Sequence, residues 1–69
     1  MRKSLKLFRV EKDLFQAQMA NKIGCSLACY NQIETGQRNP SLSFIKKFSK
    51  AFGLTMDEAV ELIDGEDKI

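Results

Sequence analysis

The sequence predicts an all-α fold, a compact domain of five helices. Apolar residues recur three and four positions apart in five successive segments, whereas no stretch alternates apolar and polar residues for long enough to form a strand. The chain has 69 residues, which suits the single domain that we place at residues 1–69. A chain this short buries only about 60% of its unfolded surface, so a partner subunit would help to stabilise it.

Two helices are expected before Gly24. The first follows Ser4, a candidate N-cap, and ends near Asp13. The second covers about residues 16–23 and stops at Gly24, which can adopt a positive φ without steric penalty.

Two more helices are expected in the middle of the chain. The third follows Ser26, whose hydroxyl can accept from a free backbone N–H, and continues to about Glu34. The fourth covers about residues 42–52 after a proline-containing loop. Its expected apolar stripe consists of Leu42, Ile45, Phe48 and Phe52.

The last helix is acidic, whereas the rest of the chain is basic. It covers about residues 55–64 and starts with a capping box formed by Thr55 and Glu58. Residues 1–52 carry ten Lys or Arg and three acids, a net charge of +7, and residues 53–69 carry one Lys and six acids, a net charge of −5. A positive body of this size is what a polyanion such as nucleic acid selects, although a solvated mixed-charge surface has the same composition.

Several classes of protein are excluded by what the chain lacks. No apolar run approaches the roughly 20 residues that span a bilayer, and the start lacks a signal peptide, so we expect a cytoplasmic protein without membrane contact. There is no His and no Gly-rich phosphate loop, so we expect no enzyme, no cofactor and no metal. The predicted fold uses all 69 residues, so we expect no small-molecule effector. We interpret Cys25 and Cys29 as reduced thiols, with an intersubunit or redox-sensing role as the alternative.

The second and third expected helices have the spacing of a helix-turn-helix, at about residues 16–35. The link around Gly24 is too short for the two helices to lie antiparallel. Ala20 falls where they cross, and a larger side chain would hold them apart. The remaining apolar positions of the unit are Met19, Ile23, Cys25, Tyr30 and Ile33.

The chain resembles the lambda and 434 repressor and Cro type of helix-turn-helix regulator from about Leu5 to Ala59. The resemblance rests on QAQMANKIGCSLACYNQIETGQRNPSLSFIKKFSKAFGLTMDE, which matches the family pattern at several spaced motifs. Phe15 departs from it, standing where the family places a Ser or Thr cap, and so does Asp13, which replaces a Gly and can itself act as a turn residue. Tyr30 is larger than the usual aliphatic residue.

The resemblance implies roles for three polar residues. Gln16 would contact a backbone phosphate, and Arg9 would pair with Glu34 while its guanidinium stays near the DNA backbone. The alternatives are that Gln16 is a surface amide and Glu34 a solvated acid. The loop after the third helix would add phosphate contacts, so the expected phosphate-binding residues are Arg9, Gln16, Gln37, Arg38 and Asn39.

The expected recognition helix contains no Lys or Arg, so it would read bases by short-range contacts. Leu27 and Ala28 suit the methyl group of thymine, whereas the amides of Asn31 and Gln32 suit adenine. An apolar residue at Leu27 could also be a plain surface residue or a protein contact. The expected base-reading residues are Ser26, Leu27, Ala28, Asn31 and Gln32.

These observations predict a sequence-specific, double-stranded DNA-binding regulator that acts as a homodimer, since one small domain reads only a half-site. We expect the dimer surface near the loop before the fourth helix and on the last helix. There Val60 and Ile63, with Ile69, would form an apolar edge, unless Val60 and Ile63 complete the monomer core. A repressor is the simplest output, and activation through an acidic patch stays open. Phage regulators, chromosomal regulators and restriction–modification controllers all fit. The alternative function is an antitoxin-like autoregulator that also binds a partner toxin protein.

Overall fold

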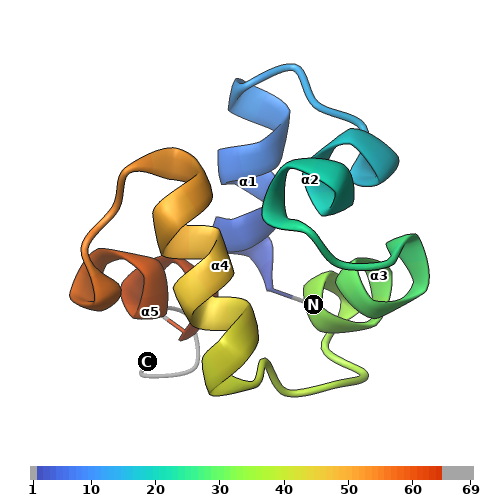
Figure 1. Ribbon diagram of the computed structural model, residues 1–69. Helices are drawn as coiled ribbons and strands as arrows, with labels where there is room; N and C mark the ends of the chain where they lie inside the picture. Colours follow the sequence, from blue (N-terminus) through green and yellow to red (C-terminus); the bar gives the residue numbers. More distant parts are fainter. Residues whose placement is uncertain (1, 65–69) are drawn as a thin grey trace.

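A computed structural model describes residues 2–64, with only the backbone of Asp64 included. The described residues form five helices and no strand, which confirms the predicted all-α fold (Figure 1). The helices are α1 (Lys3–Glu11), α2 (Gln16–Ile23), α3 (Leu27–Thr35), α4 (Leu42–Phe52) and α5 (Met56–Asp64). None of the described helices is long and apolar enough to cross a membrane.

The helices pack around one core. α2 and α3 pack against each other across the short turn at Gly24, and α4 lies between α2 and α5 (Figure 1). α1 packs on both α3 and α5, so it joins the helix-turn-helix to the C-terminal part of the fold. The buried apolar side chains come from all five helices: Leu5, Met19, Ala20, Ile23, Tyr30, Ile33, Phe44, Phe48, Ala59 and Ile63.

Aromatic rings fill the part of the core between α1 and α4. The ring of Phe48 is fully buried, and its centroid lies 5.4 Å from that of Phe8 and 5.6 Å from that of Phe52, both in edge-to-face geometry. Phe44 stacks on Phe48 and takes the buried place that we expected for Leu42, whose side chain is 62% exposed. Leu42 is the first residue of α4, where side chains lean back past the end of the helix, away from its packed face.

The first helix begins before Ser4, at Lys3, and Arg2 occupies the N-cap position without a side-chain cap. Contacts outside the helix explain this difference. The backbone N–H of Arg2 donates to the carbonyl oxygen of Glu34 at 2.8 Å, and its guanidinium donates to that of Ile33 at 2.5 Å. The end of α3 therefore anchors the first turn of α1.

The turn between α1 and α2 contains two of the residues that depart from the family pattern. Asp13 adopts a left-handed conformation with φ of +56°, as its replacement of a Gly suggested. Phe15 occupies the N-cap position of α2, where its ring cannot cap the helix, and the Gln18 side-chain oxygen accepts from the Phe15 N–H at 2.8 Å. The first turn of α2 is thus tied down by Gln18 in place of a Ser or Thr.

The other predicted helix ends are confirmed. Gly24 ends α2 with φ of +93°, a left-handed conformation that costs little without a side chain. The Ser26 hydroxyl accepts from the N–H of Cys29 at 3.0 Å at the start of α3. Thr55 and Glu58 form the capping box of α5: the Thr55 N–H donates to Glu58 Oε1 at 2.9 Å, and the Glu58 N–H donates to Thr55 Oγ1 at 3.1 Å.

Candidate nucleic-acid interface

The outer face of α3 is open to solvent along the residues predicted to read bases. Tyr30 and Ile33 bury the inner face of the helix in the core. The predicted base-reading residues lie on the other side: Ser26, Leu27 and Ala28 are exposed, and Asn31 and Gln32 are half-buried. The structure therefore presents these five residues together, at the start and along one side of α3.

A buried ion pair connects α1 to the end of α3. Arg9 Nε lies 2.9 Å from Glu34 Oε2, and Arg9 Nη2 donates to Glu34 Oε1 at 3.2 Å, so the contact is bidentate. The Arg9 side chain is 12% exposed and that of Glu34 is 1% exposed. Arg9 Nη1 also donates to the carbonyl oxygen of Leu14 at 2.7 Å. The pair implied by the resemblance is present, and Glu34 is not a solvated acid.

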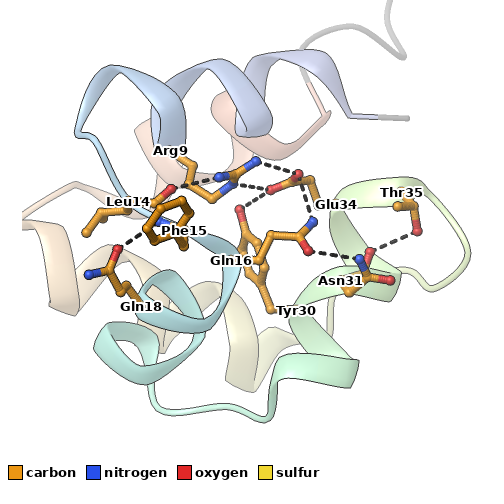
Figure 2. A network of polar contacts seen from close by, with 9 residues as sticks. All are labelled: Arg9, Leu14, Phe15, Gln16, Gln18, Tyr30, Asn31, Glu34 and Thr35. Carbon is orange, nitrogen blue, oxygen red and sulfur yellow. Dashed lines mark hydrogen bonds and ion pairs between the residues drawn. The ribbon is translucent and has the colours of Figure 1, made fainter.

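Two further donors converge on the same carboxylate (Figure 2). The Tyr30 hydroxyl donates to Glu34 Oε2 at 2.6 Å, and Gln16 Nε2 donates to Glu34 Oε1 at 3.2 Å. Each Glu34 oxygen thus accepts from two side chains, which offsets the free energy lost when the charge leaves water. The carboxylate joins side chains of α1, α2 and α3.

The surroundings of Glu34 set the protonation states of the network. Burial alone would raise the pKa of Glu34, but the hydrogen bonds from Arg9, Tyr30 and Gln16 together hold it below its ordinary value of 4.5. Burial, then the bond to Glu34, raises the pKa of Tyr30, and the bond to Glu34 raises the pKa of Arg9. Near neutral pH, Glu34 is therefore a carboxylate and Tyr30 an un-ionised donor.

This carboxylate predicts how stability depends on acid. A group whose pKa is lower in the folded protein than in the unfolded chain stabilises fully above the unfolded value and loses that contribution as pH falls through the folded value. We expect the free energy of unfolding of the wild type to fall as pH drops below about 4.5, and the fall to be shallower in Glu34→Gln. Urea titrations at several pH values measure it, with Glu11→Gln, an exposed carboxylate of α1, as the control. Equal pH slopes for wild type and Glu34→Gln would contradict the expectation.

Gln16 faces inward to two partners. While Gln16 Nε2 donates to Glu34, Gln16 Oε1 accepts from Asn31 Nδ2 at 3.1 Å. A hydrogen bond thus joins Gln16, which is predicted to contact phosphate, to Asn31, which is predicted to read bases. The sequence analysis missed this contact and the one from Tyr30 to Glu34. A phenol at an inward position four residues before an acid is a readable signal for the second, because a buried hydroxyl needs a partner.

The loop after α3 carries the remaining predicted phosphate-binding residues. Gln37, Arg38 and Asn39 are all exposed. The guanidinium of Arg2 donates to the Arg38 carbonyl oxygen at 3.2 Å and to Asn39 Oδ1 at 3.3 Å. Arg2 thereby holds this loop against the end of α3, a role that the sequence analysis did not identify.

The predicted dimer surface needs correction. Ile63 is 2% exposed and belongs to the core, so it does not form an apolar edge on the monomer. It packs inward because α5 lies against both α1 and α4. Val60 is half-buried, and Ile69 lies outside the described residues.

The two cysteines are free and half-buried. Burial raises the pKa of the Cys25 thiol. Arg38 Nη1 donates to Cys29 Sγ at 3.7 Å.

Within residues 2–64, no group of His, Cys, Asp or Glu could hold a metal ion.

Comparison with known proteins identifies similar chains. A family model described as helix-turn-helix matches residues 5–58. The chain is 38% identical over 61 residues to the cryptic phage CTXphi transcriptional repressor RstR of Vibrio cholerae, covering 88% of this chain and 53% of RstR, so it spans about half the length of that repressor. It is 40% identical over 63 residues to the control protein C.MunI of a Mycoplasma species, covering 90% of this chain and 85% of C.MunI.

A third relative is matched along its whole length. The chain is 33% identical over 66 residues to an uncharacterised HTH-type transcriptional regulator of Methanocaldococcus jannaschii, covering 96% of this chain and 100% of that protein. No solved structure matches significantly.

Proposed function

The chain belongs to the helix-turn-helix family of transcription regulators, of the lambda and 434 repressor and Cro type. We propose that it is a sequence-specific repressor that acts as a homodimer and binds a pseudo-palindromic operator in double-stranded DNA. The observation that carries the proposal is the exposed outer face of α3. That face has apolar and amide side chains at the start and along one side of a helix whose other side is buried.

Base recognition is assigned to this face of α3. Leu27 and Ala28 contact thymine methyl groups, and Asn31 and Gln32 pair with adenine, which presents one acceptor and one donor in the major groove. Ser26 lies at the same end of the helix, where backbone N–H groups also favour the approach of anionic DNA. We therefore expect A·T pairs in each half-site.

Attraction to phosphate is assigned to the residues around α3. The exposed loop residues Gln37, Arg38 and Asn39 lie directly after the helix. Gln16 is the first residue of α2, and Arg9 lies on α1. Arg9 is mostly occupied by Glu34 and the carbonyl oxygen of Leu14, so it contributes less than Arg38. The net charge of +7 on residues 1–52 supports the electrostatic part of binding.

The homodimer is proposed through the acidic end of the chain. Residues 53–69 carry a net charge of −5, which keeps this end away from DNA. Val60 on α5 is the surface residue assigned to the dimer, since Ile63 is used by the core.

Selection of bound duplexes from a random pool tests the proposal. The expected consensus is an inverted repeat with half-site centres about 10 base pairs apart and A·T pairs within each half-site. A consensus of G·C pairs alone contradicts the base-reading assignment. Absence of binding to any duplex at low salt contradicts the function, and binding that requires a second protein supports the antitoxin-like alternative instead.

Two variants in the same assay separate base reading from phosphate binding. Gln32→Ala should relax selection at one base position and cost about 1–3 kcal/mol there, because a bidentate base contact is lost. Arg38→Ala should weaken all sequences equally and reduce the slope of log affinity against log salt by about 1. If both variants change affinity in the same sequence-independent way, Gln32 does not read a base.

A further inference from the structure

Gln16 lies between a buried charge and a residue of the DNA-facing surface. It donates from Nε2 to Glu34 Oε1 at 3.2 Å and accepts at Oε1 from Asn31 Nδ2 at 3.1 Å (Figure 2). Glu34 is almost fully buried, whereas Asn31 is half-buried on the side of α3 that carries the exposed residues. One amide therefore connects the interior of the fold to the surface assigned to base reading.

The chemistry of Glu34 fixes the orientation of the Gln16 amide. An ionised carboxylate accepts hydrogen bonds and cannot donate one. Arg9 and Tyr30 also donate to Glu34, which keeps it ionised. The amide nitrogen of Gln16 must therefore face Glu34, because the opposite orientation would bring two acceptor oxygens together.

The orientation of the Gln16 amide in turn fixes the orientation of the Asn31 amide. With its nitrogen directed at Glu34, Gln16 presents its oxygen to Asn31, and only the amide nitrogen of Asn31 can donate to that oxygen. Asn31 then has one N–H and its Oδ1 oxygen left for another partner. Adenine offers N7 as an acceptor and the N6 amino group as a donor, which matches this pair, whereas guanine offers two acceptors, N7 and O6.

We propose that Gln16 is a positioning residue that makes Asn31 select adenine over guanine. The hydrogen bond to Glu34 fixes the orientation of the Gln16 amide, and the hydrogen bond from Asn31 to Gln16 then fixes which atoms of Asn31 face the base. The inference rests on the proposed function, since it requires that Asn31 faces a base pair. It differs from a phosphate contact by Gln16, which would be indifferent to sequence. The second N–H of Gln16 stays available for a phosphate, so the two roles are compatible.

The test measures a ratio of affinities. The duplex is the selected wild-type operator, made with A·T or with G·C at the base pair where Asn31→Ala relaxes selection. The wild type should prefer the A·T duplex by about 5- to 150-fold, the range of one bidentate base contact. Gln16→Met keeps the length of the side chain and removes both hydrogen bonds, so the preference should fall by about fivefold or more. In the Asn31→Ala background, Gln16→Met should leave the ratio unchanged.

Controls separate this role from folding and from phosphate binding. Gln18→Met changes another Gln of α2, whose oxygen accepts from the Phe15 N–H and not from Asn31, so it should keep the wild-type ratio. Thermal melts establish that each variant is folded, and Gln16→Ala replaces Gln16→Met in the assay if the latter is unfolded. A Gln16 variant that weakens both duplexes by the same factor overturns the proposal and leaves the proposed function intact. Wild-type protein that selects no duplex from the random pool overturns the proposed function itself.

Discussion

Replacing Arg9 by Met will lower the free energy of unfolding by about 3–5 kcal/mol, because it leaves the buried charge of Glu34 without its cationic partner. The variant also loses the bond from Arg9 to the carbonyl oxygen of Leu14, which holds the turn before α2. Native domains are stable by only about 5–15 kcal/mol, so this loss is a large share of the total free energy of unfolding. Urea unfolding followed by circular dichroism measures the change.

Lys6→Met is the matched control for this variant. Lys6 is an exposed cation on the same helix, and its replacement should change stability by about 0.5 kcal/mol or less. A loss below about 1 kcal/mol in Arg9→Met, the value typical of exposed ion pairs, would show that the network does not depend on this charge.

Replacing Phe48 by Ala should cost a similar amount, about 3–5 kcal/mol, for a different reason. The ring projects from α4, is fully buried and makes edge-to-face contacts with Phe8 and Phe52, so its removal leaves a cavity among these rings. The same urea titration measures the loss. Leu42→Ala removes an exposed apolar side chain from the same helix and should have little effect. Equal losses in the two variants would contradict the placement of Phe48 at the centre of the core.

Most of the fold could be predicted because local chemistry specifies it. The start of α3 follows from the hydroxyl of Ser26, the end of α2 from Gly24, and the start of α5 from the pairing of Thr55 with Glu58. One error arose where distant residues decide, since Arg2 extends α1 through contacts with α3. Another arose at a helix end, since Leu42 fits the helical period but is the first residue of α4 and lies outside the core.

The candidate site was less accessible from the sequence. The bond between Arg9 and Glu34 was implied by family resemblance, and no local pattern indicated it. Gln16 is hydrogen-bonded to Glu34, 18 positions away, and to Asn31, 15 positions away. The spacing of residues within one helix does not predict such contacts between helices. Ile63 was assigned to a dimer surface because the apolar period of a short helix does not reveal how many neighbours cover it.

The burial of Glu34 has a consequence for how DNA would be bound. Donors from α1 and α2 converge on its carboxylate, so this end of α3 cannot move away from them without exposing an ion pair and breaking three hydrogen bonds at once. The end of α3 is therefore held in place by folding, before any ligand binds. Under the proposed function, an operator would have to immobilise only surface side chains of α3, which favours tighter binding for the same contacts.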